Sequence, residues 1–205
     1  MAEVIVVHGY AGSGKSTQCS RLEKEGYFES PVQHISAGNR LRSIRTGLTT
    51  SAYGPLINHP DAPSPLPDEV VSGAILEAVF QEPENYNTLV LIDGYPRHPT
   101  AVEAFRNELV NRSHRLLGTI ALQVSMGTSV ERILQRGERT GEKIKADTLQ
   151  EFAIQRYELD RNTTNIAIET LAEFAPVEIV DSSGERDVVY KNFRKSIANL
   201  LTFSS

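Results

Sequence analysis

Apolar runs alternate with amphipathic stretches along the chain. Short apolar runs predict strands at residues 3–8, 32–35, 88–92, 118–124 and 177–180. Stretches with the 3.6-residue apolar period of a helix lie between them, as at residues 15–25 and 68–80. Strands that are covered by helices on both faces are short and continuously apolar. The pattern therefore predicts an α/β fold with a five-stranded parallel sheet and helices on both faces.

Four Ser/Thr-x-x-Glu patterns predict helix starts, because the hydroxyl and the carboxylate can each accept a free backbone N–H group. The pairs are Thr100 with Glu103, Thr128 with Glu131, Thr148 with Glu151 and Ser182 with Glu185. Pro67, which is followed by two acidic residues, predicts the start of a further helix.

Two segments interrupt the alternation. Residues 49–67 are rich in Pro, Ser, Asn and Gly, which predicts a surface excursion without long regular structure. Residues 137–146 are charged and contain two glycines, which predicts an exposed loop. With 205 residues, 40% of them hydrophobic, the chain can bury one core, so we expect a single domain over residues 1–205.

The charge balance excludes some classes of partner. A formal net charge of -5 gives no basic field for a nucleic acid, so a small anionic substrate bound by local Arg and Lys fits better. The apolar N-terminal stretch is too short to span a bilayer and lacks the features of a signal peptide, so we expect no membrane partner. A single cysteine, Cys19, excludes an intramolecular disulfide and agrees with a reducing, cytoplasmic compartment.

Residues 9–16, GYAGSGKS, match the pattern G-x-x-x-x-G-K-[ST] between an expected strand and an expected helix. In such a P-loop the backbone N–H groups point at phosphate oxygens, Lys15 reaches the outer phosphates, and the Ser16 hydroxyl can bind Mg²⁺. The residues expected to bind the phosphates of a nucleotide are Gly9, Ala11, Gly12, Ser13, Gly14, Lys15, Ser16 and Thr17.

Asp93 ends the apolar run at residues 88–92 and is a second candidate for the metal site. The carboxyl ends of parallel strands meet at one edge of a sheet, so Asp93 should lie beside the P-loop. Phosphoryl transfer also needs several converging cations rather than a covalent nucleophile. The candidate cations are Arg42, Arg97, Arg132, Arg136, Lys145 and Arg156.

Four blocks of sequence resemble the adenylate kinase and uridylate/cytidylate kinase family of P-loop NTPases. GSGKSTQCSRL resembles the family's P-loop and the helix after it, and HISAGNRLR resembles the start of its monophosphate-binding helices. LIDGYPR resembles the family signature D-G-[FY]-P-R, and RILQRGERTG resembles the start of its lid. The resemblance covers nearly the whole chain. It implies a core of residues 1–35, 66–135 and 148–205, a monophosphate-binding helical insertion at about 36–65, and a short lid at about 136–147.

The resemblance also implies roles for individual residues. It implies that Lys15 bridges the donor phosphates and that Arg132 approaches the donor ATP. It assigns acceptor binding to Ser36, Ala37, Arg42, Gly94 and Arg97. It assigns catalysis to Lys15, Arg42, Arg97, Arg136, Lys145 and Arg156. Phe152 lies one helical turn before Arg156, so we expect it to anchor that helix to the core.

The chain departs from the family pattern in several places. Lys145, with Lys143 as a competitor, stands where the lid usually has an arginine, and lysine lacks the bidentate fork. Thr148 replaces a second aspartate. Ser16 replaces a glycine of most members, which favours metal binding by its hydroxyl. The lid is also a few residues longer than in the short-lid members.

The two positions that normally read the acceptor base hold Ala37 and Ala101. Neither alanine side chain can hydrogen-bond a base. Ala37 resembles the uridylate/cytidylate branch of the family, but that branch has an asparagine at the position of Ala101, so neither pattern is complete and the base is left open. Nearby polar residues could substitute: His98, Thr100, Asn58 and His59.

The sequence therefore predicts a monomeric nucleoside monophosphate kinase with Mg²⁺ and ATP, and with AMP as the favoured acceptor. UMP, CMP or an unusual monophosphate is the alternative acceptor. An alcohol kinase of the same fold would need a carboxylate base, and Arg42 with Arg97 favours a phosphate acceptor instead. A non-catalytic nucleotide-binding regulatory module is the alternative of another class, because the lid and the base contacts are altered.

Overall fold

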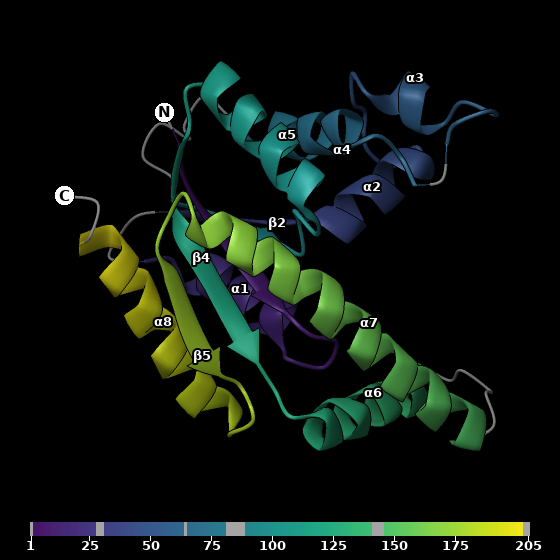
Figure 1. Ribbon diagram of the computed structural model, residues 1–205, viewed down its shortest axis with the longest axis vertical. Coiled ribbons are helices and arrows are strands. Elements are labelled where there is room, and N and C mark those ends of the chain that lie inside the picture. Colours follow the sequence, from purple (N-terminus) through teal and green to yellow (C-terminus); the bar gives the residue numbers. More distant parts are fainter. Residues whose placement is uncertain (1, 28–30, 64, 81–88, 141–145, 203–205) are drawn as a thin grey trace.

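The computed structural model describes residues 2–27, 31–63, 65–80, 89–140 and 146–202, without the side chains of residues 80, 136–140 and 146–148. Five strands form one parallel sheet in the order β2-β3-β1-β4-β5 (Figure 1). They are β1 (Glu3–Gly9), β2 (Val32–Ser36), β3 (Leu89–Asp93), β4 (Arg115–Gln123) and β5 (Val177–Asp181). The predicted five-stranded parallel sheet is confirmed, with strand bounds that differ by one to three residues.

Strand β1 lies at the centre of the sheet and pairs with β3 on one side and β4 on the other. Its residue Val7 is in register with Asp93 of β3, and Ser36 at the end of β2 is also in register with Asp93. The backbone N–H of Gly94 donates to the Val7 carbonyl at 3.1 Å. The ends of three strands therefore lie side by side, and the loops that follow β1 and β3 start at the same edge.

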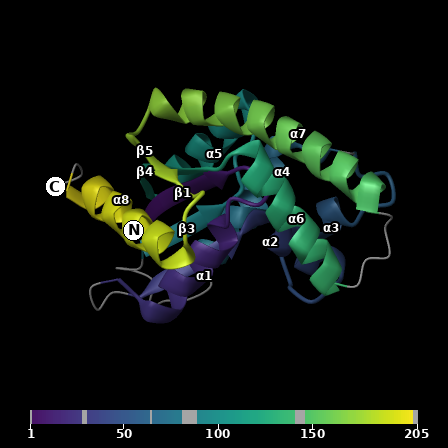
Figure 2. The ribbon, with the colours of Figure 1, turned by 90° about the horizontal axis from the view of Figure 1, so that it is seen from below.

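Helices cover both faces of the sheet (Figure 2). One face packs against α1 (Lys15–Glu25) and α8 (Arg186–Thr202), and the other against α4 (Asp68–Leu76), α5 (Pro99–Asn111) and α7 (Ala146–Ala172). Two cores form because successive side chains of a strand point to opposite faces of the sheet. Ile5 and Val7 point into the α1/α8 core, whereas Val4 and Val6 point into the α4/α5 core. All four side chains are fully buried, which is why the run is apolar throughout.

Four further elements complete the described part of the fold. They are α2 (Ala37–Arg45), the short α3 (Gly54–Ile57), the 3-10 turn η1 (Glu77–Phe80) and α6 (Met126–Thr140). Within residues 49–67 only the four-residue α3 is regular among the described residues, as predicted.

The prediction of an exposed loop at residues 137–146 is wrong at both ends. Helix α6 continues to Thr140, and α7 begins at Ala146. A glycine inside a helix costs only about 1 kcal/mol, so helix-forming neighbours can continue the helix through it. Residues 141–145 lie outside the described residues.

The four predicted helix caps are also misplaced. Helices α5, α6, α7 and α8 begin at Pro99, Met126, Ala146 and Arg186. Two of the hydroxyls bond elsewhere: Thr100 Oγ1 donates to Asp68 Oδ2 at 2.7 Å, and Ser182 Oγ donates to the Gln123 carbonyl at 2.7 Å. At α6 the serine one residue before the helix has the capping role, because Ser125 Oγ accepts the Thr128 N–H at 3.2 Å.

Within the described part of the chain, every helix is either too short or too polar to cross a lipid bilayer.

Candidate functional site

The P-loop connects the central strand β1 to helix α1 and is packed against the start of α6. Gly12 and Gly14 have φ values of 73° and 81°, a region that glycine adopts without strain. A Cβ on Gly12 would lie 2.8 Å from the Ser129 carbonyl oxygen, and Ser129 Oγ donates to the Ala11 carbonyl at 2.6 Å. Only a glycine therefore fits at residue 12. The loop ends at the N-terminus of the eleven-residue α1, where free N–H groups favour an anion.

Lys15 and Arg97 are brought together across Gly94. A Cβ built on Gly94 would lie 4.0 Å from Lys15 Cε and 3.5 Å from Arg97 Nη2. Arg97 Nε donates to the Gly94 carbonyl at 2.9 Å, across the cis Tyr95–Pro96 peptide. Burial lowers the pKa of Lys15, although the carboxylates of Asp93 and Asp160 oppose this. Two of the six candidate cations are thus brought together at this edge of the sheet.

His8 was not singled out from the sequence, although it precedes the P-loop directly. Its side chain is 2% exposed, and burial together with repulsion from Lys15 and Arg97 lowers its pKa to about 3. The imidazole is therefore neutral at physiological pH and adds no charge to the site. The sequence does carry a signal for His8, because it is a polar residue at the end of the apolar run at residues 3–8.

Asp93 and Ser16 form the predicted oxygen pair. Ser16 Oγ donates to Asp93 Oδ2 at 2.5 Å, and His34 Nε2 lies 3.5 Å from the same oxygen. Burial alone would raise the pKa of Asp93, but His34, Lys15 and Ser16 outweigh it and keep the carboxyl ionised. The other oxygen, Oδ1, is buried and has no partner among the described residues. A carboxylate oxygen that is free to bind a hard cation, next to a hydroxyl, fits Mg²⁺.

His34 is a further residue that the sequence analysis missed. It lies on β2, one strand away from Asp93, and Ser20 Oγ is 3.2 Å from its Nδ1. Among the described residues no group of three or more His, Cys, Asp or Glu side chains forms a metal cluster. A metal at Asp93 would therefore depend on ligands from a bound phosphate.

A cleft of about 360 Å³ opens in front of the P-loop, lined by residues 12–17, Arg132, Ser182 and Gly184 among others. The Arg132 guanidinium donates to the Gly12 carbonyl at 3.2 Å and to the Ser182 carbonyl at 2.9 Å, and also reaches the carbonyls of Ser183 and Gly184. Arg132 therefore joins the P-loop to the segment after β5. Its predicted contact with a donor nucleotide stays a prediction.

The predicted acceptor residues follow β2 and β3. Arg42 is exposed on α2, where its Nη2 donates to Asn39 Oδ1 at 2.5 Å. Ala37 is 5% exposed and Ala101 is fully buried in α5. Ala101 thus packs in the core rather than facing a substrate in this conformation.

The polar residues that could replace the missing base contacts are placed differently. Asn58 Nδ2 donates to the Ile44 carbonyl at 3.2 Å, so its amide is used within the insertion. His98 and Thr100 both contact the Asp68 carboxylate, at 3.3 Å and 2.7 Å. His59 is exposed and accepts the Asp61 N–H. Of these, only Thr100 lies on α5, the helix that follows Arg97, and His98 directly precedes that helix.

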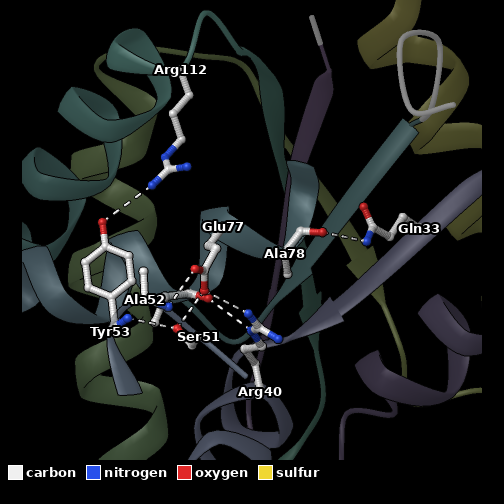
Figure 3. Close-up of polar contacts among 9 residues, drawn as sticks. Gln33, Arg40, Ser51, Ala52, Tyr53, Glu77, Ala78 and Arg112 are labelled. Atoms are coloured by element: carbon white, nitrogen blue, oxygen red, sulfur yellow. Dashed lines mark hydrogen bonds and ion pairs between the residues drawn. The ribbon is translucent and has the colours of Figure 1, made fainter. Parts of the chain in front are cut away.

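Arg40 fixes helix α2, and the sequence analysis missed it. Its Nε donates to the Ala74 carbonyl at 3.1 Å, and its Nη2 lies 3.0 Å from Glu77 Oε2 (Figure 3). Glu77 also accepts the Ser51 hydroxyl at 2.6 Å and the Ala52 N–H at 2.8 Å. This Glu77 cluster joins α2, the chain before α3, and the end of α4.

Tyr53 holds the segment around α3. Its ring occupies the space where a Cβ of Gly73 would stand, and Nη2 of Arg112, the residue after α5, donates to its hydroxyl at 3.4 Å (Figure 3). Helix α2, which carries Arg42, is therefore linked to α4 and η1 through long-range contacts.

Glu77→Gln is expected to destabilise the protein by about 1–3 kcal/mol, because it leaves the nearly buried Arg40 without its anion. Burial would raise the pKa of Glu77, but the hydrogen bonds from Ser51 and Ala52 and the charge of Arg40 lower it, so the native site prefers the carboxylate. Urea unfolding measures the loss. Glu69→Gln, at an exposed position of α4, is the matched control. Equal unfolding free energies for the two variants would contradict the role of the Glu77 cluster.

Helix α7 carries Arg156, but its anchor is not the predicted one. Phe152 is 55% exposed, so the prediction that it anchors α7 is wrong. The buried positions are Leu149, Ala153 and Tyr157. Phe152 and Arg156 are one helical turn apart and therefore share a face, and both side chains are exposed.

Two predicted lid cations are not placed by the structure. Lys145 lies outside the described residues. For Arg136 the structure describes only a backbone position in α6, four residues after Arg132.

Comparison with known proteins agrees with this geometry. A family model described as an AAA domain matches residues 8–153. The adenylate kinase of Rhodopirellula baltica is 30% identical over 200 residues, which cover 98% of this chain and 95% of that protein. The adenylate kinase of Oenococcus oeni is 26% identical over 98% of this chain and 100% of its own length. The uridylate kinase of Saccharomyces cerevisiae is 28% identical over 97% of this chain and 92% of its own.

Proposed function

This chain belongs to the adenylate kinase and uridylate kinase family of P-loop enzymes, and we propose that it transfers a phosphoryl group reversibly from Mg·ATP to AMP. Its activity as a nucleoside monophosphate kinase follows from the family, whereas the donor complex and the acceptor are the proposal. The observation that carries it is the approach of Lys15 and Arg97 at Gly94, beside Asp93. Two cations from separate loops can thereby hold two phosphate groups at one edge of the sheet.

Positioning and charge neutralisation are sufficient for this reaction. The acceptor is already an anionic phosphate, so no general base is needed. Lys15 would neutralise the donor phosphates, while Arg97 and Arg42 would hold the acceptor phosphate. Arg132, Arg136, Lys145 and Arg156 would add cations as a lid closes and excludes water.

Asp93 and Ser16 would hold Mg²⁺, supported by the buried free oxygen of Asp93 and the adjacent hydroxyl. The ion would neutralise charge that develops on the donor phosphates. The backbone of Gly9, Ala11, Gly12, Ser13 and Gly14, with Thr17 at the start of α1, would bind the phosphate chain.

The division of labour along the chain is also part of the proposal. Residues 36–65 would bind the monophosphate, with Ser36, Ala37 and Gly94 lining its site, and residues 136–147 would form the lid. We further propose that the protein acts as a monomer in the cytoplasm.

Two sets of observations favour different acceptor bases. The adenylate kinases among the relatives favour AMP, whereas Ala37 and the similarity to a uridylate kinase favour UMP or CMP. Purified protein incubated with Mg·ATP and a panel of monophosphates should form ADP fastest with AMP. Faster ADP formation with a pyrimidine monophosphate would replace the proposed acceptor. Binding of Mg·ATP without ADP formation from any monophosphate would favour the regulatory module instead.

Arg97→Ala is expected to lower kcat/KM for the acceptor by about 10- to 100-fold, because a hydrogen bond to a charged phosphate is lost. The Kd for Mg·ATP should change much less. Steady-state kinetics with varied acceptor, together with calorimetric titration of Mg·ATP, separates the two effects. The control is Lys195→Ala, because Lys195 is an exposed cation on α8, outside the segment proposed to bind the monophosphate. An unchanged kcat/KM for the acceptor would show that Arg97 is wrongly assigned.

A further inference from the structure

Asp160 is a buried carboxylate on α7 for which the proposed reaction has no assigned use. The residue is 8% exposed, and an acidic residue is seldom buried unless it is paired. Its position beside a site for polyanionic substrates is unfavourable on simple electrostatic grounds. The contacts around Asp160 therefore need a functional explanation.

The part of α7 that carries Asp160 is anchored at two points, one just after β4 and one at the P-loop. On one side the Tyr157 hydroxyl donates to the Val124 carbonyl at 3.1 Å. On the other side the hydroxyl of Tyr10, a P-loop residue, donates to Asn165 Oδ1 at 2.8 Å. The rings of Tyr10 and Tyr157 also meet edge to face, with centroids 5.3 Å apart. Asp160 lies between these anchors, so its backbone is held in place relative to the P-loop.

Asp160 is paired with one cation and affects the pKa of a second. Arg156 Nε is 3.2 Å from Asp160 Oδ1, and the charge of Asp160 also acts on Lys15, where it opposes the effect of burial on the pKa. The Arg156 side chain is 42% exposed and the Asp160 side chain 12%, so the guanidinium is held at its inner nitrogen. Within the described residues its two Nη groups have no other partner. A guanidinium bound through Nε can still present both Nη groups to a phosphate.

We propose that Asp160 is a positioning residue for phosphoryl transfer, which holds Arg156 through Nε so that its Nη groups meet the transferred phosphoryl group beside Lys15. The role rests on the proposed function. An ordinary ion pair four residues apart on a helix surface adds little stability and does not affect a rate. Asp160 differs from such a pair because it is buried and because its part of α7 is anchored both to the P-loop and to the residue after β4.

The test is a double-mutant cycle of Asp160→Asn and Arg156→Ala, with kcat, the Kd for Mg·ATP and Tm measured for each variant. In the wild-type background Asp160→Asn is expected to lower kcat about 10-fold. It should not weaken Mg·ATP binding, because it removes an anion near Lys15. In the Arg156→Ala background the same change should alter kcat by less than about twofold.

Two other substitutions of Asp160 and a control variant extend the test. Asp160→Ser should behave like Asp160→Asn if the latter folds poorly, and Asp160→Glu should recover most of the kcat, because it restores the charge. Glu158→Gln, at an exposed position on the same helix, should retain the wild-type kcat.

The outcomes separate this role from the proposed function. Full kcat in Asp160→Asn would overturn the positioning role, and so would equal losses in both backgrounds. A parallel fall in kcat, Mg·ATP affinity and Tm would assign Asp160 a structural role only. A wild-type protein that binds Mg·ATP but forms no ADP with any monophosphate would overturn the proposed function, and the role of Asp160 with it.

Discussion

Lys15→Met is expected to lower the rate of ADP formation by about 10²–10³-fold, because it removes a preorganised cation from the phosphoryl-transfer site. Methionine has a similar length and can fill the same space. Burial already disfavours the ammonium at this position, as the lowered pKa of Lys15 indicates. The variant should therefore stay folded, and its loss of activity should be chemical rather than structural.

A coupled assay for ADP with the best acceptor of the panel measures this effect, and thermal unfolding checks the fold. Lys24→Met is the matched control, because Lys24 is an exposed lysine in the last turn of the same helix. The control should retain the wild-type rate. A Lys15→Met variant with a rate within a few-fold of the wild type would mean that the P-loop lysine does not act on the transferred phosphate.

The sheet and the P-loop could be predicted from the sequence because both depend on local patterns. A strand that is buried on both faces must be apolar at every position, which holds for residues 4–7 and 89–92. The start of α1 was predicted correctly at Lys15, because the glycines before it have positive φ and a helix must begin after them. Because the strands are parallel, their carboxyl ends meet at one edge of the sheet, and this alone predicts that Asp93 lies beside the P-loop.

The helix caps failed because a capping pattern is common and carries no information on tertiary partners. Thr100 has the right spacing from Glu103, yet its hydroxyl bonds Asp68, which is 32 residues earlier in the chain. Likewise Phe152 shares a helix face with Arg156, but the period alone does not tell which face packs against the sheet. The face with Ala153 and Tyr157 is the buried one.

The missed site residues are all defined by long-range contacts. Arg40 and Glu77 are 37 residues apart, and Asp160 acts on a lysine 145 positions earlier. All three are charged residues, for which exposure is the ordinary expectation. Only their partners make their burial possible, and those partners cannot be deduced from one sequence.

Phe105→Ala is expected to reduce the free energy of unfolding by about 3–5 kcal/mol, because Phe105 is fully buried between α5 and the sheet. Its ring packs edge to face against Tyr95, with centroids 6.0 Å apart. The Tyr95 hydroxyl lies 2.8 Å from Ser72 Oγ and donates to the Asp68 carbonyl at 3.2 Å. The cavity would therefore open directly beneath the segment that positions Arg97.

Urea unfolding at low temperature measures the loss, with Phe105→Leu as a milder variant if the alanine protein is not folded. Phe174→Ala is the control, because that ring is 45% exposed and contacts the Arg106 guanidinium at 3.5 Å. Its loss should be about 1 kcal/mol or less. Since Tyr95 connects the core to Arg97, Phe105→Leu should also raise KM for the acceptor while leaving the Kd for Mg·ATP unchanged. An unchanged KM would mean that the β3–α5 loop keeps Arg97 in place without support from the core.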